Sequence, residues 1–173
     1  MKSFRSSKPR LYLAAPLFSE AERGFNRRVK GALLGVADVY LPQEDGHLLV
    51  DLVRDGMDVE RAKRRIYEGD LASIVACDLL LLVMDGRTID EGAAFELGFA
   101  RASEKVCLGL KTDPRVLLPI GDNPMIECAL TARFADVATL RAWIRDWAEA
   151  EDRPAKYRRG SPSSGRMSVD AGG

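Results

Sequence analysis

Histidine and cysteine are scarce in this sequence, which has one histidine and three cysteines in 173 residues. Cys77, Cys107 and Cys128 lie far apart among apolar residues, without a CxxC pair or a Cys/His cluster. A structural zinc site needs four such ligands at short spacings, and a disulfide framework needs paired cysteines. The sequence therefore argues against both, and the cysteine usage is typical of a reducing compartment. We expect no metal.

Long apolar runs and an excess of charge are lacking as well. No apolar run approaches 18 residues, and residues 1–10 have no apolar core of the signal-peptide kind, so we expect a cytoplasmic protein without membrane contact. The 26 basic residues are balanced by 26 acidic ones, which leaves no positive field to hold a nucleic-acid polymer. The motifs GxGxxG, GxxxxGK(S/T) and GxSxG are absent, and no cofactor is expected.

Apolar and amphipathic segments alternate along the chain. Strands are predicted at 10–16, 39–41, 78–85, 106–110 and 133–135, and helices at 19–34, 58–76, 90–103, 124–130 and 137–150. Residues 43–56 are predicted to form a loop. The 79–83 run is apolar throughout, which is typical of a parallel strand covered on both faces. Strands alternating with helices indicate βαβ units, a five-stranded parallel sheet and an α/β fold.

The composition changes near residue 151, where the sequence becomes rich in Pro, Ser, Gly and Arg. Such a segment cannot bury enough apolar surface to order itself. We therefore predict one domain over residues 10–150, with a flexible N-terminal segment (1–9) and a flexible C-terminal tail (151–173).

Glu96 is the most informative residue for chemistry. Ligands of open parallel sheets bind beyond the carboxyl ends of the strands, and the helix after the third strand starts there at Asp90. Glu96 would lie over Gly92 and Ala93, one turn back, whose small size leaves room for a ligand. The nearby helix N-terminus would favour an ionised carboxylate, as attack on an anomeric carbon requires. Alternatively, Glu96 is a surface residue paired with Arg101.

Asp70 is unusual because it lies on the apolar stripe of its helix, four residues from both Ile66 and Ile74. A carboxylate in that position either faces a cavity, where burial would raise its pKa, or pairs with a cation one turn away. The available cations are Lys63, Arg64 and Arg65. Tyr12, near the end of the first strand, either packs on the sheet or orients a carboxylate with its hydroxyl.

Together these residues resemble the nucleoside 2-deoxyribosyltransferase family. The matching segments are LYLAAP at 11–16, Asp70 seven residues before the CD pair at 77–78, DEGAAFELG at 90–98 and NPM at 123–125. The 90–98 segment is the most specific of them, and the resemblance covers roughly residues 10–150. It implies a flavodoxin-like, doubly wound α/β sandwich.

The resemblance also implies an activity, the transfer of 2-deoxyribose between nucleobases, with slow hydrolysis as a side reaction. Glu96 would be the nucleophile, Tyr12 would hold it, and Asp70 would manage the proton of the base. Asp90 would contact the sugar 5′-hydroxyl. Asn123 would complete the site of a neighbouring subunit in a homo-oligomer, and the partners would be deoxynucleosides and free nucleobases.

Two other functions remain open. A 2′-deoxynucleoside 5′-monophosphate N-glycosidase has the same fold, but those relatives carry a serine where Asp90 stands, because a hydroxyl tolerates a phosphate that a carboxylate repels. A non-enzymatic nucleotide or metabolite sensor would not need a nucleophile at Glu96. Comparing the wild type with Glu96→Ala separates sensor from enzyme.

Overall fold

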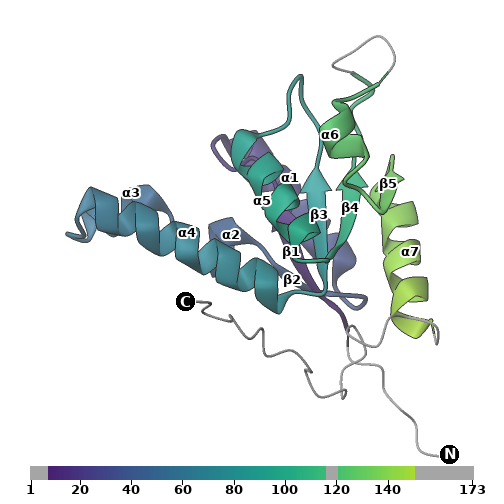
Figure 1. Cartoon of the computed structure of the whole chain (residues 1–173), viewed down its shortest axis with the longest axis horizontal. Helices are drawn as coiled ribbons and strands as arrows, with labels where there is room; N and C mark the ends of the chain where they lie inside the picture. The colour runs from purple at the N-terminus through teal and green to yellow at the C-terminus, as the bar shows by residue number, and fades with distance from the viewer. Residues whose placement is uncertain (1–7, 116–120, 151–173) are drawn as a thin grey trace, which may run out of the picture.

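The computed structural model describes residues 8–115 and 121–150, which form a five-stranded parallel sheet between two layers of helices (Figure 1). The sheet order is β2-β1-β3-β4-β5, the flavodoxin-like order expected from the sequence. Its strands are β1 (Arg10–Ala14), β2 (Asp38–Tyr40), β3 (Leu79–Val83), β4 (Val106–Leu110) and β5 (Ala132–Phe134). Residues 1–7 and 151–173, where flexible ends were predicted, lie outside the described residues.

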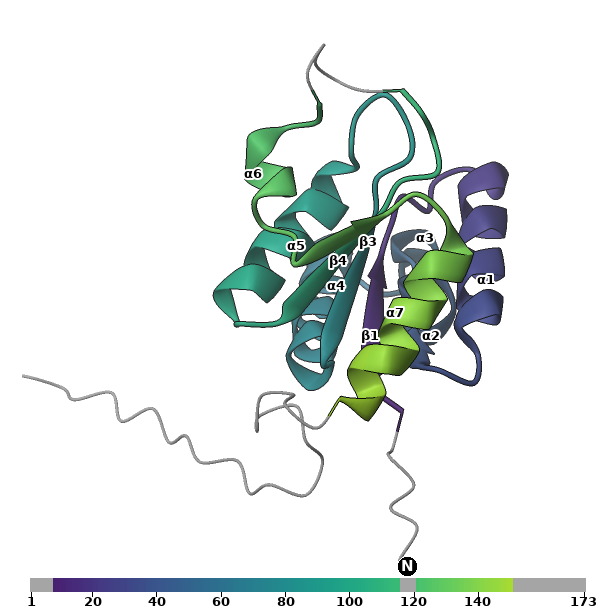
Figure 2. The ribbon, with the colours of Figure 1, turned by 90° about the vertical axis from the view of Figure 1, so that its right-hand side faces the viewer.

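The helices cover both faces of the sheet. Helices α1 (Glu20–Leu33) and α7 (Val137–Glu149) pack on one face, and α4 (Val59–Ala76) and α5 (Glu91–Ala102) lie on the other (Figure 2). Leu79 and Leu81 of β3 point to the first layer, whereas Leu80 and Leu82 point to the second. All four are fully buried, which explains the continuous apolar run of this strand.

The long helices begin where side chains can cap them. Ser19 forms a capping box with Glu22 at the start of α1. Asp58, Asp90 and Asp136 accept backbone N–H bonds at the starts of α4, α5 and α7. These starts agree with the sequence prediction to within one residue, because caps are local features that a sequence displays directly.

The prediction of a loop over 43–56 is wrong. This segment contains two short helices, α2 (Pro42–Asp45) and α3 (Leu49–Arg54). Neither has a side-chain cap, and neither is long enough to show a helical repeat, so only tertiary packing stabilises them. Helix α6 (Pro124–Glu127) is also shorter than the predicted 124–130 segment.

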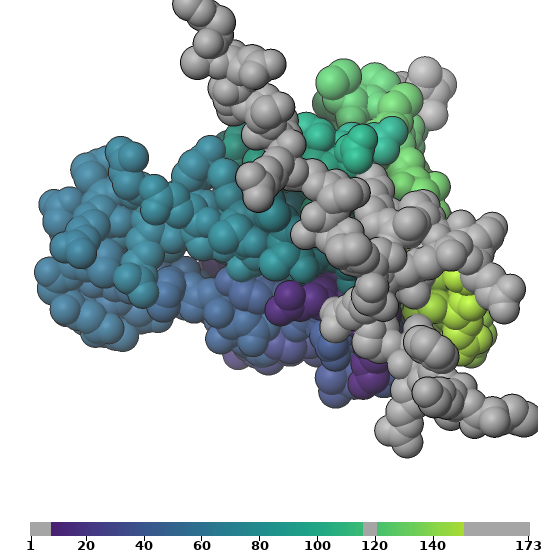
Figure 3. Space-filling model, turned by 60° about the horizontal axis from the view of Figure 1, so that its bottom comes forward, coloured from purple at the N-terminus to yellow at the C-terminus, as the bar shows by residue number. Residues whose placement is uncertain are grey.

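The first half of α4 extends past the sheet, together with α3, as a lobe at one end of the molecule (Figures 1 and 3). Val59 is 43% exposed there, although the sequence placed it on the buried stripe of the helix. Ala62 is buried, and Ile74 is buried against the sheet layer near the end of the helix. Among the described residues, no helix is both long and apolar enough to cross a membrane.

Candidate active site

A hollow of about 460 Å³ lies at the carboxyl edge of the sheet, between the loops that follow β1 and β3. Parallel sheets bind ligands at this edge because the loops there diverge to either side of the sheet. Its wall contains four acidic side chains and one aromatic ring, and it is formed by Pro16, Phe18, Glu22, Asp85, Gly86, Arg87, Thr88, Ile89, Asp90 and Glu91.

Glu96 and Tyr12 meet next to this edge, although 84 residues separate them in the sequence. The Tyr12 hydroxyl donates a 2.6 Å hydrogen bond to Glu96 Oε1. Tyr12 is completely buried on β1, so its ring holds the hydroxyl in a fixed position. The hydrogen bond uses Glu96 Oε1 and leaves Oε2 available to a ligand. No ion pair to Glu96 occurs in the described part of the chain, so the alternative pairing with Arg101 is not formed.

Asp70 comes from α4 and faces the same pair of residues. It lies within electrostatic range of Glu96 and Tyr12, and His47 is the positive group that acts on it. None of the ion pairs formed by residues 8–115 and 121–150 includes Asp70, so the alternative of a cation one turn away is not realised. The structure thus brings Tyr12, Asp70 and Glu96 into one cluster from three different elements.

Burial raises the proton affinity of all three groups. It raises the pKa of Glu96 to about 8, with Asp70 and Asp90 adding to the shift and the Tyr12 hydrogen bond opposing it. Burial raises the pKa of Asp70 to about 6, against the lowering effects of Tyr12 and His47. The pKa of Tyr12 rises too, through burial and the neighbouring carboxylates. Desolvation of Glu96 thus opposes the field of the helix N-terminus, which the sequence suggested would favour its ionised form.

The raised pKa of Glu96 predicts that this residue destabilises the fold in alkaline solution. A group with a raised native pKa contributes stability below its ordinary pKa, here 4.5, and loses it as the pH rises through about 8. Glu96→Gln stays neutral, so it should unfold at higher temperature than the wild type at pH 9 and at a similar temperature at pH 4. The difference at pH 9 should be on the order of 5 kcal/mol, because each pKa unit between 4.5 and about 8 corresponds to about 1.4 kcal/mol. Thermal unfolding at both pH values measures it.

The matched control for this measurement is Glu91→Gln, which removes an exposed carboxylate from the first turn of the same helix. It should not produce a stability difference that grows with pH. Equal stabilities of Glu96→Gln and the wild type at pH 9 would contradict the raised pKa.

Asp90 has a double position, as the N-cap of α5 and as part of the wall of the hollow. Its Oδ2 accepts a 2.8 Å bond from the Ala93 N–H, which leaves Oδ1 free of described partners. Gly92 keeps space beside this carboxylate, because a Cβ at that position would lie only 3.1 Å from Asp90 Oδ2. A polar ligand group can therefore reach Asp90 past Gly92.

Asn123 lies in a second hollow, of about 250 Å³, on the other side of the 86–89 turn. It caps α6 by accepting a 2.9 Å bond from the Met125 N–H, so its amide nitrogen points away from the helix backbone. Asn123 is exposed, and the Met125 side chain is 80% exposed. The structure does not bring Asn123 into a described contact with Tyr12, Asp70 or Glu96 of its own chain.

A buried ion pair fixes the segment that carries Asn123. Lys111, directly after β4, donates to Asp122 Oδ1 at 2.5 Å, and both side chains are less than a tenth exposed. Arg133 of β5 extends this pair, with its Nη1 at 3.5 Å from Asp122 and 2.8 Å from Glu127. A charge buried this deeply is strongly unfavourable without its partner, so the pair ties the start of α6 to the end of the sheet.

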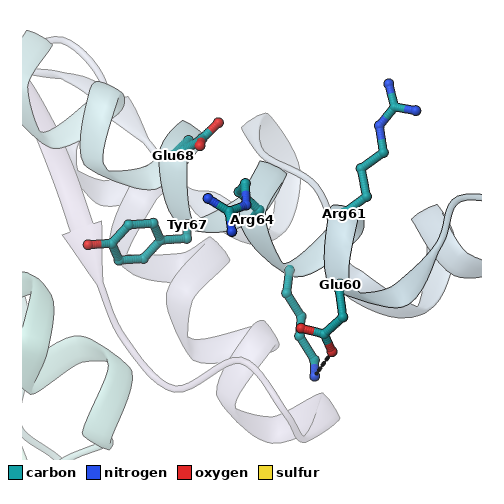
Figure 4. A pocket seen from close by; sticks show the side chains of 6 residues that line it. Glu60, Arg61, Arg64, Tyr67 and Glu68 are labelled. Carbon is teal, nitrogen blue, oxygen red and sulfur yellow. Dashed lines mark hydrogen bonds and ion pairs between the residues drawn. The ribbon is translucent and has the colours of Figure 1, made fainter.

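Two other features do not form part of the candidate site: Asp85, which joins two loops, and a hollow along α4. Asp85 follows β3, but its oxygens accept bonds from the Thr112 and Asp113 backbone, so it joins two loops. The hollow along α4 has a volume of about 620 Å³ and is lined by residues of that helix alone (Figure 4). These side chains point in different directions, and Glu60 pairs with Lys63. In the part of the chain that the structure describes, no group of three His, Cys, Asp or Glu could hold a metal ion.

Sequence analysis did not identify Phe18 and Tyr40. Phe18 is 76% exposed at the rim of the hollow of about 460 Å³. Tyr40 stacks on Tyr12, with ring centroids 5.4 Å apart. Phe18 shows no sequence signal apart from an aromatic residue in the loop after a strand. Tyr40 ends the second strand and would have been recognisable once the two strands were known to be neighbours.

Several solved structures share this arrangement of elements. A conserved protein from Enterococcus faecalis V583 is 24% identical, with a TM-score of 0.62 over 81% of this chain and 99% of its own. A 2-deoxyribosyltransferase from Bacillus psychrosaccharolyticus is also 24% identical, with a TM-score of 0.64 over 78% of this chain and 95% of its own. A CMP N-glycosidase from Clostridium botulinum is 14% identical, with a TM-score of 0.47 over 78% and 96%.

These similarities establish the fold class, a flavodoxin-like α/β sandwich. No curated protein matches the chain. The model of the nucleoside 2-deoxyribosyltransferase family matches residues 11–158, which is most of the sequence, and the chain belongs to that family. It is therefore an enzyme of nucleoside or nucleotide chemistry, either a transferase or a related N-glycosidase.

Proposed function

We propose that the protein transfers 2-deoxyribose from one nucleobase to another through a covalent ester on Glu96. The 2.6 Å bond between Tyr12 and Glu96 carries the proposal, because it orients a half-buried carboxylate while leaving its second oxygen free. Membership of the family supports the same reaction. Attack on an anomeric carbon needs a positioned carboxylate of this kind.

In the first step, Glu96 reacts in its ionised form, and its Oε2 forms a bond to C1′ of a bound deoxynucleoside as the bond from C1′ to the base nitrogen breaks. The electron pair of that bond leaves with the base, and Asp70 supplies the proton that neutralises it. Its raised pKa of about 6 suits a carboxylate that delivers a proton near neutral pH. Tyr12 holds Glu96 through Oε1 and stabilises its charge before attack.

In the second step, a nitrogen of another base attacks C1′, the ester bond breaks, and Asp70 takes up the proton that the incoming base loses. Two inversions at C1′ give overall retention. Water in place of the second base yields free 2-deoxyribose, the slow side reaction. Asp90 binds the 5′-hydroxyl of the sugar, and Gly92, which has no side chain, leaves room for the sugar beside that carboxylate. The exposed ring of Phe18 offers a stacking surface for a base.

The test is an exchange assay with one deoxynucleoside and a different free base. A new deoxynucleoside, separated by chromatography, is the expected product, and free deoxyribose should form slowly when no acceptor base is present. Cleavage of deoxynucleoside 5′-monophosphates without any exchange would instead support the N-glycosidase. Binding of nucleosides without turnover of either substrate would support a sensor.

One observation favours the N-glycosidase as the second candidate. Arg87, in the turn before Asp90, is exposed, lines both hollows and has no described partner. A guanidinium in that position is suited to a 5′-phosphate. Asp90 opposes this assignment, since its carboxylate repels the same group, so the nucleoside remains the proposed substrate.

We further propose that the protein is a homo-oligomer in which Asn123 acts in the site of a neighbouring chain. Asn123 is exposed, and among the described contacts only its amide oxygen is used, so the amide nitrogen is available to a neighbouring chain. Apolar side chains on the α3–α4 lobe and beside the site are also exposed, which is typical of a surface that packs on another protein. They are Leu49, Val50, Val53, Val59, Tyr67 and Phe95.

This assignment predicts that two inactive variants restore activity when combined. Glu96→Ala and Asn123→Ala chains should each be inactive or strongly impaired alone. Mixed oligomers, refolded or co-expressed together, contain sites with Glu96 from one chain and Asn123 from the other. A site of this composition is intact, so up to about a quarter of the wild-type rate should return. Exchange activity of the mixture measures it.

The control is a mixture of the two variants that were each assembled separately and added together only in the assay. Without exchange of subunits, this mixture should stay inactive. Full activity of a wild-type monomer in dilute solution would contradict the shared site.

A further inference from the structure

Tyr40 has an unusual relation to Tyr12. The two residues face each other in the β1–β2 register, and their rings stack with centroids 5.4 Å apart and planes within 18°. Tyr12 is fully buried and Tyr40 is partly buried, so Tyr40 forms the outer cover of the Tyr12 ring. A stacked ring restricts the tilt of its neighbour, and tilt determines where the Tyr12 hydroxyl points.

The hydroxyl end of Tyr40 is held as well. A Cβ on Gly46 would lie 3.0 Å from the Tyr40 hydroxyl and 2.7 Å from the Pro42 carbonyl oxygen, so the 42–46 turn closes tightly over it. Ser73 of α4 lowers the pKa of this hydroxyl, and Asp70 raises it electrostatically. Tyr40 is thus held at both ends, by its stack and by the turn that closes over its hydroxyl.

The Tyr12 hydroxyl has one proton and two carboxylates beside it. In the structure it donates to Glu96, and Asp70 lies close enough to compete for the same proton. We propose that Tyr40 is a positioning residue, whose stacked ring holds the Tyr12 hydroxyl on Glu96 and away from Asp70. This inference rests on the proposed function, in which Glu96 is the nucleophile and Asp70 the acid.

Groups on several elements act on this cluster, and all of them bear on its titration. Glu96 is faced by Tyr12, Asp70 and Asp90, and Asp70 is faced by Tyr12 and His47. Tyr40 is faced by Ser73, Asp70, Asp45 and Cys77. Asp70 acts electrostatically on both Tyr40 and Glu96, whereas Tyr12 stacks on Tyr40 and hydrogen-bonds to Glu96, so the loss of the stack should reach Glu96 through Tyr12.

Two variants of Tyr40 separate the ring from the hydroxyl. Tyr40→Met keeps apolar volume but removes the stack, whereas Tyr40→Phe keeps the stack and removes the hydroxyl. The readout is the pH titration of the Glu96 and Asp70 carboxyl carbons by NMR, in protein labelled with ¹³C-glutamate or ¹³C-aspartate. The signals are assigned by their loss in Glu96→Gln and Asp70→Asn.

In Tyr40→Met, the Glu96 titration should move up by about one pKa unit and the Asp70 titration should move down, since the Tyr12 proton is then shared between them. Tyr40→Phe should leave the Glu96 titration within a few tenths of the wild type. For exchange, kcat of Tyr40→Met should fall about tenfold, the ratio that corresponds to 1.4 kcal/mol, with little change in KM. A purely structural role would lower stability without moving either titration.

Trp143→Met is the matched control. It removes one ring of the Trp143–Trp147 stack on the opposite face of the sheet, so it should lower stability without shifting Glu96 or Asp70. Tyr40→Leu gives a second route if Tyr40→Met does not fold, because it also keeps apolar volume and removes the stack; the same two shifts are expected.

Unmoved Glu96 and Asp70 titrations in the folded variant would overturn the inference. So would a Tyr40→Phe shift as large as that of Tyr40→Met. Because the titrations need no substrate, they remain informative if the exchange assay fails. If the wild-type protein catalysed neither exchange nor hydrolysis, the proposed function would be contradicted. The titration shifts would still measure the link between Tyr40 and Glu96.

Discussion

Glu96→Ala is expected to lower the rate of deoxyribosyl exchange by roughly three orders of magnitude or more, equivalent to about 4 kcal/mol of transition-state stabilisation. Without the carboxylate no ester can form, and direct displacement by a second base lacks the positioned nucleophile. The fold should persist, because Glu96 is only partly buried and its loss removes a carboxyl group that burial destabilises. Exchange assays with circular dichroism of the variant test both parts.

Glu91→Ala is the matched control for this experiment. Glu91 lies in the first turn of the same helix and is exposed, so its loss tests the general effect of removing negative charge near the site. It should retain most of the wild-type rate. If Glu96→Ala retained more than about a tenth of that rate, Glu96 could not be the nucleophile.

The covalent intermediate can be observed in the wild type. A 2-fluoro-2-deoxy nucleoside should form the glycosyl ester and release it slowly, because fluorine destabilises the positively charged transition states of both steps. Intact-mass spectrometry should show the added sugar on the wild type and none on Glu96→Ala. Kinetics of exchange should be ping-pong. Sequential kinetics without an adduct would indicate direct hydrolysis instead.

The second large effect concerns Asp90 and the choice between nucleosides and nucleotides. The free Oδ1 of Asp90 can accept a hydrogen bond from a 5′-hydroxyl, a charge-assisted bond worth about 1.5–3 kcal/mol. A 5′-phosphate instead brings about two negative charges to that carboxylate. At about 4 Å and an effective dielectric near 20, each unit pair costs on the order of 4 kcal/mol.

We therefore expect kcat/KM for a deoxynucleoside to exceed that for its 5′-monophosphate by at least about 100-fold, equivalent to roughly 2.7 kcal/mol. Asp90→Ser should narrow this ratio. Serine is a suitable test because it also caps helices well, so the start of α5 and the position of Glu96 are preserved. Asp90→Ala would remove the cap together with the charge, and the two effects could not be separated.

Arg87→Gln is the companion variant, because Arg87 is the cation that could offset Asp90. If Arg87 neutralises the phosphate, Arg87→Gln should slow monophosphate turnover and leave nucleoside turnover nearly unchanged. Equal turnover of nucleosides and monophosphates by the wild type would reject the nucleoside preference and favour the N-glycosidase.

The sequence by itself determined the elements that depend on neighbouring residues. The apolar 79–83 run predicted a strand buried on both faces, and the capping residues Ser19, Asp58 and Asp90 predicted three helix starts. The order of these elements was sufficient for a parallel α/β sheet, and the 90–98 segment was sufficient for the family. Local patterns failed at 42–54, where two helices are too short to show a helical repeat and lack side-chain caps, and where α3 packs along α4.

The tertiary structure alone decided how the candidate site is assembled and charged. Tyr12 and Glu96 are 84 residues apart, and only the neighbouring positions of β1 and α5 bring them within 2.6 Å. The stack of Tyr40 on Tyr12 follows from strand order, which no local pattern specifies. The sequence suggested an ionised Glu96, whereas burial raises its pKa to about 8. A proton affinity depends on how much water the whole fold removes from a carboxylate, so it appears only when the layers are packed together.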